Sequence, residues 1–232
     1  MPVLWECQSP TAAHITEWPR NQAYTALDWR RPEPDMGKRV VAIIGSYRKG
    51  GVNDTVVQEL LAAAREKGAE TRTFYLTDQN IKFCTNCRKC AQTPGPERGK
   101  CLQEDDLEPM LQAIDGADSL VLSSPVLCGN VSAIFRRFME RLMGYGYWPW
   151  GQPAPRSRMK PTRKAVLVAS SAMPSLMMRI FTGAPTALRT TARSLGAKTM
   201  GNLWIGLAAG EPHHTLSPRE LAKARRLGAK LA

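Results

Sequence analysis

The chain has 232 residues, of which 43% are hydrophobic and 22% charged, and its formal net charge is +12. This length admits one α/β domain or two small ones with a substantial core, and we favour one domain. No run approaches the roughly 18 consecutive apolar residues of a membrane span, and a secretory signal is not evident, so we expect a cytoplasmic protein with no membrane partner.

The positive charge is spread along the chain. Basic residues occur at Arg30-Arg31, Arg136-Arg137, 156–164 and 219–230, without an aromatic-interleaved strand or a recognition helix. This distribution favours a solvated basic surface, so nucleic acid is not expected as a partner. A nucleotide that carries phosphate would still be attracted to such a surface.

Residues 1–36 have no regular period. Five prolines interrupt them, and Trp5, Trp18, Tyr24 and Trp29 follow neither helical nor alternating spacing. We therefore predict an irregular N-terminal arm, with its aromatic side chains packed on the domain surface or on a second subunit. Residues 37–232 are predicted to form the domain.

From residue 38 onward, short apolar strands alternate with helices. Strands are predicted at 40–44, 69–76, 119–123, 165–169 and 199–206, and helices at 55–67, 105–114, 131–143, 184–195 and from Ser217-Pro218 onward. Apolar strands of this kind must be covered on both faces, which predicts a doubly wound, five-stranded parallel sheet in three layers with strand order 2-1-3-4-5. Ligands of such sheets bind beyond the carboxyl ends of the first and third strands. Loops 46–54 and 124–130 follow those two strands.

The first of these loops has the composition of a phosphate cradle. Ser46 and Thr55 supply hydroxyls, Arg48 supplies a guanidinium, and small residues free the backbone N–H groups at a helix N-terminus. The loop matches neither the GxGxxG fingerprint nor the Walker motif. An ordinary strand-to-helix turn is the alternative interpretation.

Motifs in three regions resemble the flavodoxin-like NADPH-dependent FMN reductase family, including its iron-sulfur flavoprotein branch. They are the run 45–55 (GSYRKGGVNDT), the runs 124–129 (SPVLCG) and 136–141 (RRFMER), and the series Ile81, Cys84, Cys87, Cys90, Cys101, Asp105 and Asp106. The resemblance covers about residues 38–232. It implies a flavodoxin-like fold, bound FMN, NAD(P)H as cosubstrate and a homodimer.

The resemblance also implies three sets of FMN contacts. The phosphate would be held by Ser46, Arg48, Asn53, Asp54 and Thr55. The isoalloxazine and ribityl chain would be bordered by Ser124, Pro125, Val126, Leu127, Cys128, Gly129 and Asn130. A third loop, with Ser170 and Ser171, would approach the ring from the other side. The chain departs from the family at Leu127, where a tyrosine is usual, and more mildly at Glu140, where an aspartate is usual.

Four of the six cysteines lie within eighteen residues. Cys84, Cys87 and Cys90 have the CxxCxxC spacing, and Cys101 follows after ten residues that include Pro94, Gly95, Pro96 and Gly99. Such a set can hold a 4Fe-4S cluster, and the intervening residues can bend back, although this connection is longer than in the iron-sulfur branch. A cysteine loop without metal and a structural zinc site are the alternatives.

The segment 144–161 combines aromatic and basic residues. We predict a lid or a dimer contact near the flavin, with Arg156, Arg158 and Lys160 on the NADPH phosphate; a surface hairpin is the alternative. We expect no site role for Cys128 or for the histidines. Cys128 is expected to be a small buried side chain, and the histidines are expected to be surface or turn residues. No Ser-His-Asp set is found.

Together these features predict an FMN-dependent oxidoreductase that passes electrons from NAD(P)H to a quinone, flavin or other small acceptor. Flavin chemistry places hydride acceptance on the cofactor, so we predict no catalytic side chain. One alternative is an electron carrier that combines FMN with a 4Fe-4S cluster. Another is a basic binding module that has lost its flavin, for which Leu127 is the main support.

Overall fold

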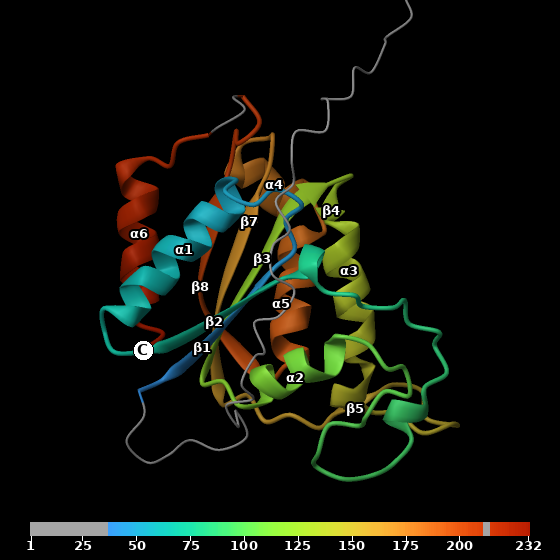
Figure 1. Cartoon of the computed structure of the whole chain (residues 1–232). Helices are drawn as coiled ribbons and strands as arrows, with labels where there is room; N and C mark the ends of the chain where they lie inside the picture. The colour runs from blue at the N-terminus through green and yellow to red at the C-terminus, as the bar shows by residue number, and fades with distance from the viewer. Residues whose placement is uncertain (1–36, 211–213) are drawn as a thin grey trace, which may run out of the picture.

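The computed structural model describes residues 37–210 and 214–232, so the predicted arm of residues 1–36 lies outside the described residues. A sheet of five parallel strands forms the centre of the molecule (Figure 1). Across the sheet the strands are β2 (Glu70–Tyr75), β1 (Arg39–Ile44), β3 (Ser119–Leu127), β7 (Arg163–Ser170) and β8 (Ala197–Ile205). Counted along the chain this is the order 2-1-3-4-5, which confirms the prediction.

Helices cover both faces of the sheet (Figure 1). One face carries α1 (Val52–Arg65) and α6 (Pro218–Gly228); the other carries α2 (Leu107–Asp115), α3 (Ala133–Glu140) and α5 (Ala184–Ser194). Successive strand residues point to opposite faces, so Val41 and Ile43 belong to one apolar core, and Val40 and Ile44 to the other. The predicted three layers are therefore present.

Two element boundaries near the first and third strands differ from the prediction. Helix α1 begins at Val52, which places Asn53, Asp54 and Thr55 on its first turn. Strand β3 continues to Leu127 and folds back into β4 (Asn130–Val131). The two turn residues between them, Cys128 and Gly129, both have positive φ (49° and 75°), as a tight two-residue hairpin turn requires.

Capping explains how two other helices begin. Ser217 accepts a hydrogen bond from the backbone N–H of Glu220 (3.3 Å), and the Glu220 carboxylate accepts one from the backbone N–H of Ser217 (2.8 Å). The predicted Ser217 cap is thus confirmed. The predicted helix 131–143 is instead α3, capped by Ser132, followed by the 3₁₀ helix η3 (Arg141–Tyr145).

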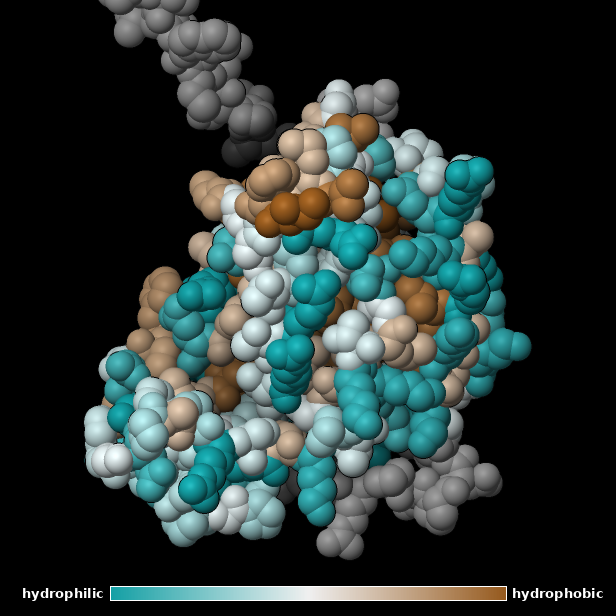
Figure 2. Space-filling model, turned by 180° about the vertical axis from the view of Figure 1, so that it is seen from behind, coloured by the Kyte–Doolittle hydropathy of each residue, from teal (hydrophilic) through white to brown (hydrophobic). Residues whose placement is uncertain are grey.

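Helix α4 (Ser175–Phe181) was not predicted, because its apolar side chains face outward and show no buried stripe. Exposed fractions are 62% for Leu176, 65% for Ile180 and 69% for Phe181. With the exposed Met177 and Leu207 they form a surface that we call the apolar rim. Figure 2 shows the corresponding group of hydrophobic residues at the top of the molecule, where α4 lies in Figure 1.

The remaining short elements are η1 (Leu76–Asp78), η2 (Lys89–Ala91), and a two-stranded hairpin of β5 (Gly146–Tyr147) and β6 (Arg156–Ser157). Within residues 37–210 and 214–232, no helix has the length and apolar character needed to cross a bilayer.

Candidate functional site

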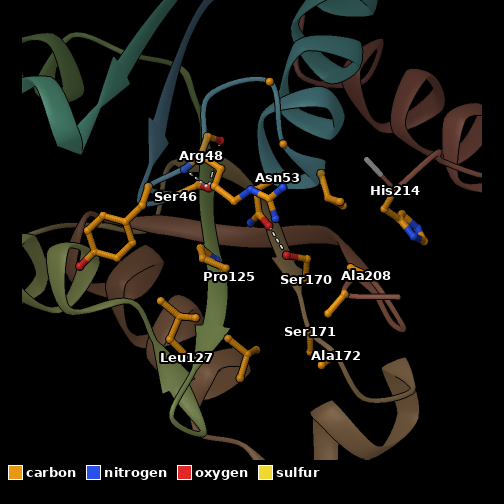
Figure 3. A pocket seen from close by; sticks show the side chains of 16 residues that line it. Ser46, Arg48, Asn53, Pro125, Leu127, Ser170, Ser171, Ala172, Ala208 and His214 are labelled. Atoms are coloured by element: carbon orange, nitrogen blue, oxygen red, sulfur yellow. Dashed lines mark hydrogen bonds between the residues drawn. The ribbon is translucent and has the colours of Figure 1, made fainter. Parts of the chain in front are cut away.

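A cavity of about 330 Å³ lies at the carboxyl ends of β1, β3, β7 and β8 (Figure 3). Its lining residues lie at the ends of these strands, after them, or at the start of α1. They are Ser46, Tyr47, Arg48, Gly50, Gly51, Val52, Asn53, Pro125, Val126, Leu127, Ser170, Ser171, Ala172, Ala208, Ala209 and His214. The volume is in the range of small-molecule sites. The structure therefore has a cavity at the predicted switch point, and eight of the predicted site residues line it.

One end of the cavity has the features of an anion site. The N-cap of α1 is Gly51, which has no side chain to cap the helix, and the first N–H groups of a helix lack intrahelical partners. The loop before it is held by the Ser46 hydroxyl, which accepts a hydrogen bond from the backbone N–H of Arg48 (3.2 Å). The helix dipole, Arg48 and Ser46 together fit the phosphate of a mononucleotide.

Asn53 connects this loop to the sheet. Its amide nitrogen donates to the Ser123 hydroxyl (2.9 Å), and its amide oxygen accepts from the Ser170 hydroxyl, a bond drawn in Figure 3. All three side chains are buried. The amide thus joins α1 to β3 and β7. Asn53 lines the cavity as predicted, but both ends of its amide are engaged by the protein.

Asp54 and Thr55 do not line the cavity. The Asp54 carboxylate accepts from the backbone N–H of Gly50 (2.7 Å) and from the Tyr75 hydroxyl (2.9 Å). Burial, followed by the hydrogen bond to Asp54, raises the pKa of Tyr75 to about 12. Thr55 donates to the carbonyl of Gly51 (3.2 Å). A carboxylate has no donor for a phosphate, so Asp54 is suited to stabilise the loop instead.

The second loop contributes Pro125, Val126 and Leu127 to the cavity wall. Ser124 is buried behind them, where its hydroxyl accepts from the backbone N–H of Ser132 (2.9 Å). The hairpin turn carries Cys128 and Gly129 outside the cavity lining, and Asn130 accepts from the backbone N–H of Val131 (2.8 Å). Cys128 is exposed, so the prediction of a buried side chain is wrong; the turn places it at the hairpin tip.

Part of the lining was not predicted. Ala172 follows Ser170 and Ser171, Ala208 and Ala209 follow β8, and His214 completes that side. The rule that ligands lie at strand carboxyl ends, applied also to the fifth strand, would have found the two alanines. The sequence predicts a surface or turn position for His214, and no spacing pattern indicates a role in the site.

Comparison with known proteins identifies the family. The sequence profile of the NADPH-dependent FMN reductase family matches residues 38–210. The chain belongs to this family. This membership confirms the resemblance seen in its motifs.

Curated relatives include two iron-sulfur flavoproteins. One, from Archaeoglobus fulgidus, is 30% identical over 48% of this chain and 48% of its own length. Another, from Methanocaldococcus jannaschii, is 37% identical over 44% of this chain and 51% of its own length. The chain thus matches about half the length of these relatives.

Solved structures share the fold. An FMN-dependent NADH-azoreductase from Bacillus anthracis superposes with a TM-score of 0.62 at 14% identity, over 85% of this chain and 100% of that chain. An NAD(P)H:quinone oxidoreductase from Methanothermobacter marburgensis gives 0.60 at 17% identity, over 84% and 97%. With the observed strand order, these likenesses confirm the flavodoxin-like fold.

The four clustered cysteines lie in one region away from the cavity lining. We call residues 84–101 the cysteine segment; its thiols are all free. Burial raises the pKa of Cys90, and the charges of Cys101, Cys87 and Cys84 add to the rise, so these three thiols are within electrostatic reach of Cys90. Among the described residues, however, no group of three or more Cys, His, Asp or Glu is arranged to hold a metal ion. Thiolates are suitable ligands for an iron-sulfur cluster, but the four cysteines are not arranged around one metal position.

The predicted lid, residues 144–161, packs on the cysteine segment and contributes nothing to the cavity lining. The Arg88 guanidinium lies 3.8 Å from the ring centroid of Trp148 and 4.2 Å from that of Trp150. Arg158, predicted to meet NADPH, donates to the carbonyls of Thr93 (2.6 Å) and Gly95 (2.8 Å). Cation–π stacking and hydrogen bonds thus hold this hairpin on the cysteine segment, and its role as a lid or a dimer contact stays a prediction.

Proposed function

We propose that the protein binds FMN in this cavity, takes electrons from NAD(P)H and passes them to a small acceptor such as a quinone or a flavin. One observation carries the proposal. The switch point of the sheet holds a cavity with an anion-binding end at α1 and an apolar wall from β3. Membership of the NADPH-dependent FMN reductase family supports FMN and NAD(P)H as the molecules involved.

The residues divide between the two ends of the cofactor. Ser46, Arg48 and the first N–H groups of α1 hold the phosphate. Pro125, Val126 and Leu127 form one wall for the ring, and the loop 170–172 forms the opposite wall. Bound FMN would supply the redox chemistry, accepting a hydride and passing two electrons on. The side chains position the ring and keep water from its buried face, so no catalytic side chain is assigned.

The side chain of Leu127 indicates which kind of electron acceptor the cavity can take. It stands where the family usually has a tyrosine, lines the cavity next to Val126 and is 45% exposed. An open, apolar edge favours a planar apolar acceptor over a charged one. We therefore place quinones first among the acceptors.

Turnover by the flavin-loaded protein tests this function. The full chain, reconstituted with FMN, is expected to oxidise NADPH or NADH in the presence of a soluble quinone, and the Arg48→Ala variant to do so only at higher FMN concentration. A fully loaded wild-type protein that oxidises neither nucleotide would contradict the proposal.

A second candidate function is an iron-sulfur flavoprotein, in which a 4Fe-4S cluster on Cys84, Cys87, Cys90 and Cys101 works with FMN. The names of the curated relatives favour it, as does the electrostatic effect of Cys84, Cys87 and Cys101 on Cys90. Anaerobic purification with iron and sulfide analysis decides between the two. About four irons per chain are expected for the cluster, and an iron-free protein that still turns over NAD(P)H leaves only the first function.

We also propose a homodimer in the cytoplasm. The apolar rim is exposed, and it adjoins the cavity along the chain, since Leu207 precedes Ala208 of the lining and α4 follows Ala172. Exposed apolar patches mark protein contacts, and the free thiols suit a reducing compartment. Light scattering is expected to give a dimer for the wild type and a monomer for Ile180→Glu. Thr190→Glu, on the exposed face of α5, is the control and stays dimeric; a dimeric Ile180→Glu protein would exclude this contact. A chain beginning at Met36 tests the predicted clasp by the arm.

A further inference from the structure

A second cavity, of about 540 Å³, lies at the opposite end of the sheet from the cavity proposed for FMN. It is lined by the segment before β7, by α5 and by the start of β8, and its apolar part consists of Met159, Pro161 and Ala197. The nine residues of β8 separate the two ends of the sheet, a length of about 30 Å at the rise of a strand. The two cavities are therefore distinct, and the proposed turnover does not use the second one.

Three cations line the second cavity. They are Arg189, Arg193 and Lys198, and the Thr199 hydroxyl adds a further polar group. In the part of the chain that the structure describes, the lining contains no acidic residue, and none of the three cations has a carboxylate partner. Arg189 is half-buried, whereas Arg193 and Lys198 are exposed. A half-buried guanidinium without a counter-charge is unfavourable, so the lining is suited to an external anion.

The spacing of the two arginines strengthens the positive charge. Arg189 and Arg193 are four residues apart and therefore lie on the same side of α5, where like charges destabilise a helix. Glu140 lines the neighbouring cavity together with Arg193, but its carboxylate pairs with Arg136 (3.4 Å). An anion bound between the arginines would relieve their repulsion.

The carboxyl end of α5 would oppose an anion if its carbonyl groups were free. Arg163 occupies two carbonyls at this end: its Nη1 donates to Leu195 (2.8 Å), and its backbone N–H donates to Gly196 (3.2 Å). Its other side-chain bonds go to the carbonyls of Asp115 (2.7 Å) and Ala117 (3.1 Å). Arg163 therefore caps the negative end of the helix with a positive charge beside the cavity.

Gly196 brings the walls of the cavity together. It has a positive φ of 67°, and a Cβ at this position would lie 2.8 Å from the carbonyl oxygen of Lys160 and 2.9 Å from Cβ of Met159. The turn from α5 into β8 thus packs directly on the backbone before β7. This close packing keeps the arginines of α5 and Lys198 of β8 around one hollow.

We propose that this cavity binds a small molecule with two adjacent phosphate groups. Each phosphate carries about 1.5–2 negative charges near neutral pH, so two of them balance the three cations of the lining. The guanidinium forks of Arg189 and Arg193 suit phosphate oxygens, and Lys198 and Thr199 add single contacts. A concave site of this volume takes a small ligand, whereas nucleic acid needs an extended basic surface.

Inorganic diphosphate is the probe that tests this site. The full chain, without added FMN, is titrated with diphosphate by calorimetry at constant ionic strength, and saturation at one diphosphate per chain is expected. Thermal unfolding is expected to move to higher temperature as diphosphate is added, because the ligand binds the folded state. Sulfate, which has a single anionic group, is expected to bind more weakly under the same conditions.

A double variant, Arg189→Gln with Arg193→Gln, removes the two arginines of the site. The Kd for diphosphate is expected to rise about 10- to 100-fold, because charge-assisted contacts are lost. The matched control is Arg219→Gln with Lys223→Gln, since both residues are exposed and stand four apart on α6. It loses the same charge at the same spacing and is expected to bind diphosphate like the wild type.

Lys198→Gln gives a second measurement that leaves α5 intact, and it is expected to weaken diphosphate binding several-fold. Circular dichroism shows whether each variant folds. If the double variant of α5 does not fold, Lys198→Gln decides, and an unchanged Kd in this variant would then overturn the proposal.

Four further results would overturn the proposal. Diphosphate binding that does not saturate excludes the site, and equal losses in the two double variants would assign binding to the overall positive charge. Weaker binding by Arg48→Ala, with unchanged binding by the α5 variant, would place diphosphate in the cavity proposed for FMN. Tighter binding of an oligonucleotide than of diphosphate, lost in the α5 variant, would identify nucleic acid as the ligand. None of these results bears on FMN turnover.

Discussion

The cavity and the cysteine segment are built by different kinds of contact. The cavity is assembled from residues at the ends of adjacent strands, joined by short side-chain bonds such as Asn53 to Ser123 and Ser170. The cysteine segment contains no strand, and its one regular element is the short η2. Three arginines make its long-range contacts: Arg141 with Cys101, Arg88 with Trp148, and Arg158 with the carbonyls of Thr93 and Gly95.

The two regions also differ in geometry. The strand ends, fixed by the sheet, form a cavity lined by residues of several strands. Three thiols are within electrostatic reach of Cys90, but among the described residues they form no group arranged to hold a metal ion. Helix α3 connects the regions: the backbone N–H of Ile134 donates to the Tyr47 hydroxyl (3.2 Å), and Arg141 follows its last turn. Its eight residues span about 12 Å.

The largest effect is expected from Asp105→Ala, which removes the buried partner of Arg141. Both side chains are 1% exposed, so the guanidinium would be left buried and uncompensated, at a cost of about 3–5 kcal/mol in the free energy of unfolding. Urea denaturation of the wild type and the variant measures this loss of stability. Glu59→Ala breaks the exposed pair with Arg225 and is expected to cost less than about 1 kcal/mol. Equal losses in the two variants would contradict the importance of burial.

The same pair predicts a response to acid. Burial alone would raise the pKa of Asp105, but the bonds from Arg141 and the backbone outweigh it, and the pKa lies below its ordinary value. The stabilisation is therefore complete above the unfolded pKa of about 3.9 and is lost as pH falls through the lower folded pKa. Urea denaturation is measured at several pH values between the folded and the unfolded pKa of Asp105. As the pH falls through this range, the wild type is expected to lose more stability than Asp105→Asn. Parallel curves would argue against a charged Asp105.

Arg48→Ala tests the anion end of the cavity. Loss of a charge-assisted contact to the phosphate, worth about 1.5–3 kcal/mol, is expected to raise the Kd for FMN about 10- to 100-fold, as followed by flavin fluorescence. Arg65→Ala, at the other end of α1, is the control and should bind FMN like the wild type. Riboflavin, which lacks the phosphate, should not distinguish Arg48→Ala from the wild type.

Asn53→Ala tests the link between α1 and the sheet. The hydroxyls of Ser123 and Ser170 would lose a buried partner, which is expected to reduce stability by about 1–3 kcal/mol and to weaken FMN binding as the loop loosens. Thermal unfolding and FMN titration give the two quantities. Weaker FMN binding without any loss of stability would instead identify Asn53 as a direct ligand.

Leu127→Tyr is expected to have the smallest effect. A tyrosine restores the family's usual residue at the cavity wall and can stack on a flavin, a contact worth about 0.5–1.5 kcal/mol. FMN is expected to bind several-fold more tightly, and the activity with bulky quinones to fall because the open edge is filled. An unchanged Kd would show that residue 127 lies away from the ring.

Local patterns predicted the cavity better than the cysteine region. Apolar strands of fixed order place loops 46–54 and 124–130 together, and residues such as Ser46, Arg48 and Pro125 line the cavity as a consequence. The direction of the Asp54 side chain could not be predicted from the sequence, because it depends on a hydrogen bond from Tyr75 at the end of β2. The stacking of Arg88 on Trp148 joins residues sixty positions apart, and no periodicity records such a contact.

The central claim is that the cavity beyond β1 and β3 holds FMN by its phosphate. A titration of the purified full chain with FMN, followed by flavin fluorescence for the wild type and Arg48→Ala in parallel, tests it most directly. Saturation at one FMN per chain, with clearly weaker binding by the variant, is the predicted result. Absence of saturable binding, or identical binding by the two proteins, would contradict the account.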